Sequence, residues 1–115
     1  MSIKILHLTL HAKAFEVMIT GEKQIEYRNN TKWIFSRLYK KEISKTGFEY
    51  FTPKKYDFVK FTNGYGKDKP YFIAEFVFHA ELLDGGYEKY SNGLEVLLTP
   101  GMHVIKIGRI IEKNN

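Results

Sequence analysis

Three side chains that can do chemistry lie within one short run, residues 21–28, which reads GEKQIEYR. An ammonium (Lys23), a carboxylate (Glu26) and a guanidinium (Arg28) at this spacing can bind an anion or act as an acid–base pair. If the run forms a strand, Glu26 and Arg28 share one face about 7 Å apart, within reach of each other. The run therefore predicts the edge of a binding cleft, with the Lys23 ammonium at its mouth.

The elements before this run place it at a helix-to-strand junction. Residues 3–10 alternate apolar and polar side chains, which predicts a half-buried strand. Residues 12–20 repeat apolar side chains at helical spacing, with Phe15 and Met18 on one stripe. Gly21 follows directly and predicts the helix stop, because glycine adopts positive φ at little cost. We expect residues 24–28 to form the next strand.

A second helix is predicted after the turn residues Asn29 and Asn30. Thr31 or Asn30 can cap its first turn, and the helix then runs to Tyr39 with Ile34 and Leu38 facing inward. Trp33 and Arg37 are four positions apart, so they share a face on which the guanidinium can stack on the indole. We expect this face to border the cleft, with Trp33 as a stacking platform and Arg37 as a phosphate contact.

The remainder of the chain reads as loops and strands. Residues 42–55 are predicted to be a loop, and residues 56–62 a strand that ends in a long turn whose Asn63 and Tyr65 are further candidates for ligand contact. Residues 72–81 form the clearest long strand, expected at the centre of the sheet. Glycine-rich residues 84–93 precede a short strand, 94–98, and a last strand, 104–111, in which Gly108 indicates a bulge or a barrel corner. The prediction is a single α+β domain, 1–115, with two short helices and about five to six mostly antiparallel strands.

The pattern G-x-K-x-x-E-x-R at residues 21–28, with the strand and helix before it, resembles the signature of the ASCH family. Gly21, Lys23, Glu26 and Arg28 match the pattern. The resemblance implies a small PUA-like β-barrel with the two helices packed at its ends. It also implies recognition of RNA or a modified nucleotide, with Lys23, Glu26 and Arg28 at the ligand and with Trp33, Arg37, Asn63 and Tyr65 as the further contacts.

Composition and charge agree with a small nucleic-acid-binding domain. The net charge is +5, and residues 31–60 alone hold eight Lys and Arg against three Asp and Glu, which is the footprint expected of a surface for a polyanion. Aromatic residues make up 16% of the chain, enough to supply stacking surfaces as well as a core.

Several classes of site lack their sequence signatures. The absence of cysteine excludes disulfides, thiolate metal sites and a cysteine nucleophile, and a reducing cytoplasm is the expected location. The first residues are too interrupted for a signal peptide, and no stretch approaches a membrane span. The four histidines lack the spacing of metal ligands, and no cofactor-binding motif occurs, so we expect neither a metal nor a cofactor.

Two further readings stay open beside a binding module. The first is a small hydrolase or ribonuclease in which Lys23 and Glu26 are the catalytic pair. Some ASCH-like proteins resemble amidohydrolases of acylated cytidine that use a lysine and a threonine of this motif. Lys23 matches that lysine, but Glu26 stands in the place of the threonine. The second reading is a partner-binding adaptor, which a cleft filled by Tyr or Phe side chains would favour.

Overall fold

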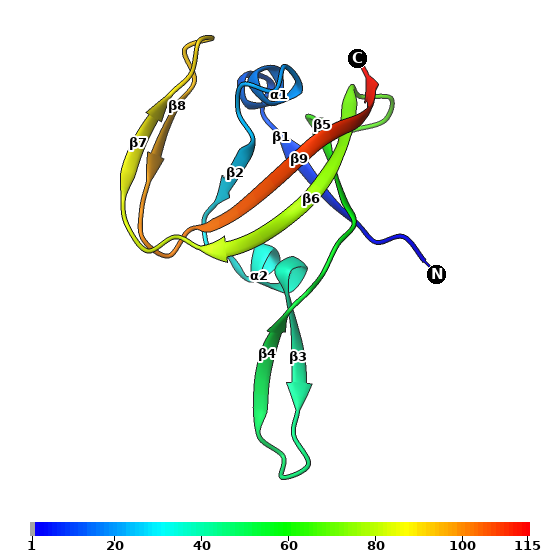
Figure 1. The fold of residues 1–115 in the computed structure, drawn as a ribbon, viewed down its shortest axis with the longest axis vertical. Helices are drawn as coiled ribbons and strands as arrows, with labels where there is room; N and C mark the ends of the chain where they lie inside the picture. Colours follow the sequence, from blue (N-terminus) through cyan, green and yellow to red (C-terminus); the bar gives the residue numbers. More distant parts are fainter. Residues whose placement is uncertain (1) are drawn as a thin grey trace.

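Five strands form one curled sheet, and the other four strands of the described chain form two separate hairpins. The computed structural model describes residues 2–115. In chain order its elements are β1 (Ile5–Leu10), α1 (Ala12–Ile19), β2 (Ile25–Arg28), α2 (Lys32–Leu38), β3 (Tyr39–Ile43), β4 (Glu49–Pro53), β5 (Phe58–Asn63), β6 (Tyr71–Glu81), β7 (Gly86–Lys89), β8 (Glu95–Leu98) and β9 (His103–Asn114). Figure 1 shows the β3–β4 and β7–β8 hairpins extending from the body in different directions.

The main sheet has the strand order β1-β5-β6-β9-β2, so β6 is central, as the sequence predicts. Only β1 and β5 pair in parallel, and the other three pairs are antiparallel. The predicted bulge at Gly108 is confirmed: Ala74 pairs with Ile110 but Phe76 pairs with Ile107, so β9 holds one extra residue there. A β-carbon on Gly108 would lie 3.0 Å from the Glu75 carboxylate, so a larger residue here requires the Glu75 side chain to shift. The bulge bends β9 and helps to curl the sheet into a half-barrel.

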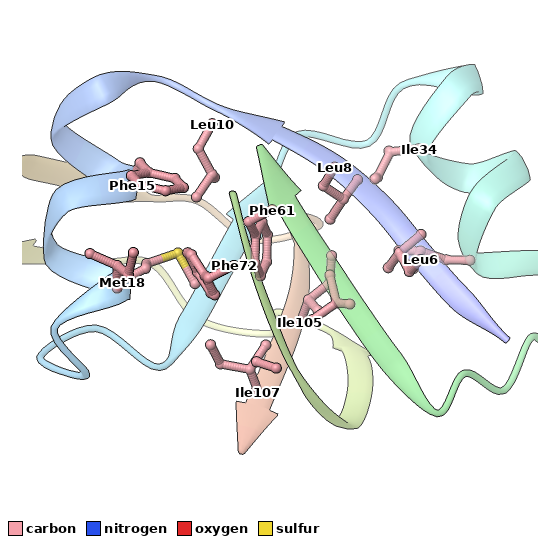
Figure 2. Packing of buried hydrophobic residues seen from close by; sticks show 14 residues of the cluster. Leu6, Leu8, Leu10, Phe15, Met18, Ile34, Phe61, Phe72, Ile105 and Ile107 are labelled. Atoms are coloured by element: carbon pink, nitrogen blue, oxygen red, sulfur yellow. The ribbon is translucent and has the colours of Figure 1, made fainter. Parts of the chain in front are cut away.

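The two helices close the core at opposite ends. Figure 2 shows α1 beside Phe15 and Met18 at one end and α2 beside Ile34 at the other, with strand side chains between them. The predicted cap is present, because the Thr31 side chain accepts a hydrogen bond from the Ile34 N–H at 3.2 Å. Ile34 and Leu38 are buried, as predicted. No helix within residues 2–115 has the length and apolar character needed to cross a membrane.

Two segments differ from the sequence-based prediction. Residues 42–55 are not a loop, because β3 and β4 pair from Tyr39↔Pro53 to Ile43↔Glu49. The glycine-rich stretch before β8 contains a further strand, β7, which pairs with β8. The strands β3, β4 and β7 bury no full face against the core, so they lack the apolar alternation by which a half-buried strand is recognised.

Two apolar residues of β6 should contribute very differently to the free energy of unfolding. Phe72 is fully buried and packs against Phe15 and Phe61 at ring-centroid distances of 5.4 and 5.3 Å, whereas Val77 is exposed. We expect Phe72→Ala to lower the free energy of unfolding by about 3–5 kcal/mol, because it leaves a cavity. Val77→Ala should change it by less than about 0.5 kcal/mol. Urea denaturation measures both, and equal losses in the two variants would show that this core is misassigned.

Candidate functional site

A pocket of about 580 Å³ opens where β1, β2 and β5 end and the β7–β8 hairpin approaches the sheet. Its walls come from five places in the chain: the end of β1 and the start of α1 (Thr9, Leu10, His11, Ala12, Ala14), the turn and β2 (Lys23, Glu26, Tyr27, Arg28, Asn29), the turn after β5 (Asn63, Gly64, Tyr65), the β8 region (Leu94, Val96) and Met102. Five of the seven residues predicted from the sequence to contact the ligand therefore line one pocket.

Lys23 lies in the floor of this pocket. Gly21 has a φ of +90°, and the turn it makes brings the Lys23 N–H back to the Val17 carbonyl at 3.2 Å. The Lys23 side chain then runs inward and is only 2% exposed. Its ammonium donates to the Ile25 carbonyl and to Glu26 Oε1, the latter at 3.2 Å. The expectation of a lysine at the mouth is wrong, because the turn folds the side chain under the strand.

Glu26 is held between two cations. Its Oε1 accepts from Lys23, and its Oε2 accepts from Arg28 Nε at 2.8 Å. Glu26 and Arg28 meet on one strand face, as the side-chain period predicts. Arg28 Nη2 also donates to the Thr9 carbonyl at 2.6 Å, so the cluster ties β2 to β1. A buried carboxylate with both oxygens paired in this way is a fixed anion.

Arg28 is the charged group of this cluster that can reach a ligand. Its side chain is 24% exposed, against 10% for Glu26 and 2% for Lys23. Arg28 Nε donates to Glu26 and Arg28 Nη2 donates to the Thr9 carbonyl, whereas no group within residues 2–115 accepts a hydrogen bond from Arg28 Nη1. A guanidinium fixed along one edge and open at another is suited to bind a phosphate or carboxylate in one orientation.

Two amides and two tyrosines complete the polar part of the pocket. Asn63 pairs with Leu10 in the β1–β5 register, which puts it next to the end of β1. Asn29 follows Arg28 directly, and neither amide side chain is hydrogen-bonded within residues 2–115. Tyr65 is 86% exposed at the rim, and Tyr27 lies deeper in the wall. An amide carries both a donor and an acceptor, which is what the edge of a nucleobase needs.

The β7–β8 hairpin is held beside the pocket by hydrogen bonds from β7 and from the turn that follows it. Glu22 accepts from the Ser91 backbone N–H at 2.8 Å and from the Ser91 hydroxyl, and these bonds lower the pKa of Glu22. Asn92 donates to the Lys13 carbonyl at 2.9 Å, and the Tyr27 hydroxyl donates to Glu88 at 3.2 Å. Burial, with the Glu88 charge, raises the pKa of Tyr27 to about 12, so the phenol keeps its proton at neutral pH.

Sequence reasoning missed Asn29, Tyr27 and the β8 side chains. Asn29 could have been predicted from the sequence, since it directly follows Arg28 at the end of a predicted strand. Leu94 and Val96 were not, because they reach the pocket only through the tertiary placement of the hairpin.

Trp33 and Arg37 lie outside the pocket walls. They form the predicted stack, with the guanidinium 5.1 Å from the indole centroid. Trp33 is 48% exposed and is therefore no part of the core. The pair occupies the outer face of α2, the helix that begins three residues after Asn29.

The site gives no geometric support for a metal. Within residues 2–115 no three His, Asp or Glu side chains lie close enough together to hold a cation.

No protein family, curated protein or solved structure matched the chain in three comparisons.

Lys23 provides a test of the buried charge cluster. We expect Lys23→Met to lower the free energy of unfolding by about 3 kcal/mol, because it leaves the Glu26 carboxylate buried with one of its two cations removed. The matched control is Lys41→Met, which breaks an ion pair with Glu49 of similar length, 3.0 Å, between two exposed side chains. That loss should stay within about 1 kcal/mol. Equal losses in chemical denaturation would contradict a buried cluster.

His103 makes the stability depend on pH. It is buried at the start of β9, opposite Arg28; its Nε2 bonds Asn30 Oδ1 at 2.8 Å, and its Nδ1 has no partner within residues 2–115. Burial lowers the pKa of His103, and Glu81 opposes this in part. The unfolded chain then takes up the proton first as the pH falls, so stability should be lost below about pH 6.5.

The variant His103→Gln keeps a donor for Asn30 and removes the titration. Its free energy of unfolding should change less between neutral and mildly acidic pH than that of the wild type. Some dependence should remain, because burial also lowers the pKa of His79. Exposed His7→Gln is the control, and it should keep the wild-type profile. A wild-type profile in His103→Gln would assign the effect to other groups.

Proposed function

We propose that this protein binds an unpaired nucleotide of RNA, or a modified nucleotide, in the pocket beside Arg28. The observation that carries the proposal is the Arg28 guanidinium, fixed by Glu26 and Thr9 and open toward the pocket. The pocket volume of about 580 Å³ lies within the usual range for small-ligand sites. A nucleotide supplies both an anion for the guanidinium and a base edge for the amides of Asn29 and Asn63.

The likeness to the ASCH signature supports the same conclusion. Gly21, Lys23, Glu26 and Arg28 are the residues of that pattern, and together they build the turn and the buried cluster below the pocket. A PUA-like barrel is part of this proposal, and the curled sheet with a helix at each end of the core is compatible with it. The net charge of +5 further favours a nucleic acid as ligand.

Binding is better supported than catalysis by Lys23 and Glu26. A general base needs a free lone pair within reach of the substrate, whereas both Glu26 oxygens are paired with cations. The Lys23 ammonium is buried and engaged by Ile25 and Glu26. We assign the pair to holding Arg28 in place. A partner-binding adaptor would be favoured by a cleft filled with Tyr or Phe side chains. The pocket is instead open, and its tyrosines lie in the walls, so this alternative is not supported.

Arg28→Lys is the decisive variant. It keeps the positive charge beside Glu26 but loses the planar fork, so affinity for a fluorescein-labelled single-stranded RNA of mixed sequence should fall about 10-fold. Asn63→Ala should also weaken binding, since it removes a base-edge contact. Fluorescence anisotropy at about 50 and 200 mM salt measures both, and wild-type binding should weaken at the higher salt.

Arg109→Lys is the matched control, an exposed arginine of β9 that is not in the pocket walls. It should bind RNA like the wild type. The proposal fails if Arg28→Lys and Asn63→Ala bind as tightly as this control, or if the wild type shows no salt-dependent binding.

A further inference from the structure

A second hollow, of about 600 Å³, lies where the β3–β4 hairpin joins the body, and lysines dominate it. Lys4, Lys40, Lys54 and Lys55 line it, together with Ile5, Thr52, Pro53 and Tyr56. These side chains come from the segment before β1, from β3 and from β4 with the link to β5, so tertiary folding alone gathers them. Figure 1 shows the hairpin projecting from the body beneath α2. We call this hollow the lysine groove.

The acidic groups nearby compensate only part of this charge. Glu42 lies 3.6 Å from the Lys40 ammonium, in a loose exposed pair. Asp57 accepts a hydrogen bond from the Lys4 backbone N–H at 2.8 Å. The Lys54 ammonium donates to the Ser36 carbonyl at 2.9 Å, a neutral partner. Lys4 and Lys55 have no ion pair within residues 2–115. The groove therefore keeps a net positive charge.

Two elements connect the lysine groove to the Arg28 pocket. The first is β1, which begins beside Lys4 at Ile5, in the wall of the groove, and ends at Thr9 and Leu10, in the wall of the pocket. The six residues of β1 span roughly 16 Å from one site to the other. An extended strand of a few nucleotides can cover that distance.

The second connecting element is α2. Asn29, in the pocket wall, lies just before it, and its last turn meets the groove because the Ser36 and Arg37 carbonyls accept from Lys54 and Tyr56. The exposed stack of Trp33 and Arg37 lies on this helix, between its two ends. A flat indole beside a guanidinium suits an unpaired base and its phosphate.

We propose that the lysine groove binds the sugar–phosphate backbone of the same single-stranded RNA whose nucleotide enters the Arg28 pocket, with Trp33 and Arg37 contacting the nucleotides between. This inference rests on the proposed function. It places Trp33 and Arg37 along the path of the RNA between the lysine groove and the Arg28 pocket. A single strand fits better than a duplex, because both the pocket and the exposed indole need unstacked bases. Phosphates fit better than an acidic protein, because nucleotides also use the indole and the pocket amides.

The test compares two variants that remove equal charge. Lys40→Gln with Lys55→Gln neutralises two exposed lysines of the groove. Arg109→Gln with Lys113→Gln neutralises two exposed cations of β9 toward its C-terminal end, which lies far from the hairpin in Figure 1. Anisotropy titrations over a range of salt concentrations use two labelled RNAs, a dinucleotide and a single strand of about 12 nucleotides.

The groove variant should bind the longer RNA roughly 25-fold more weakly at about 0.1 M salt, with a salt slope lowered by about 1.4, because each phosphate contact to a single strand contributes about 0.7. Its dinucleotide affinity should stay at the wild-type value, since the dinucleotide fills only the pocket. The β9 control should change neither affinity by more than the small effect of net charge.

The outcomes separate the two proposals. If both double variants bind the longer RNA alike while Arg28→Lys still weakens the dinucleotide, the groove inference is overturned and the pocket function stands. If the groove variant loses affinity but Arg28→Lys binds both RNAs like the wild type, the pocket function is overturned. The inference that one RNA strand occupies both the groove and the pocket is then overturned as well. If polyglutamate of equal charge displaces the longer RNA as well as unlabelled RNA does, the groove selects charge alone and the inference fails.

Discussion

The buried carboxylate of Glu26 is the constraint on which the site depends. A charge removed from water is tolerated only when it is paired and hydrogen-bonded, and Glu26 meets this condition with Lys23 on one oxygen and Arg28 on the other. Satisfying it requires the sharp turn at Gly21, since only that turn returns Lys23 beneath the strand. It also requires β2 to lie beside the end of β1, where the Thr9 carbonyl accepts from Arg28.

The three charged side chains of this cluster have different roles. Lys23 and Arg28 both pair with Glu26, and Arg28, the most exposed of the three, is the group that we propose contacts a ligand. A rigid support of this kind reduces the conformational entropy that a long arginine side chain would lose on binding. The cluster therefore gives the pocket a preorganised cation in place of a mobile one.

The two hairpins extend the surface that we propose binds RNA beyond the small body of the protein. An isolated two-stranded hairpin is marginally stable in water, so each must be anchored to the body. The β7–β8 hairpin is anchored by Glu22, Lys13 and Tyr27, and it contributes the apolar wall of the pocket. The β3–β4 hairpin is anchored at its root, where Lys54 and Tyr56 donate to the last turn of α2. Its root forms the lysine groove.

Local physics determined much of this protein from the sequence. Gly21 ends α1, Thr31 caps α2, Gly108 marks the bulge, and the alternation in residues 72–81 marks the central strand, because each depends on neighbours in the chain or on one buried face. The meeting of Glu26 with Arg28 follows from the same two-residue period. The tertiary structure alone decided that Lys23 is buried, that Trp33 lies outside the pocket, and that lysines from three segments line one groove. It also decided that residues 39–53 form a hairpin, since strands without a buried face carry no periodic signal. These features depend on contacts between distant segments, and no local pattern in the sequence encodes such contacts.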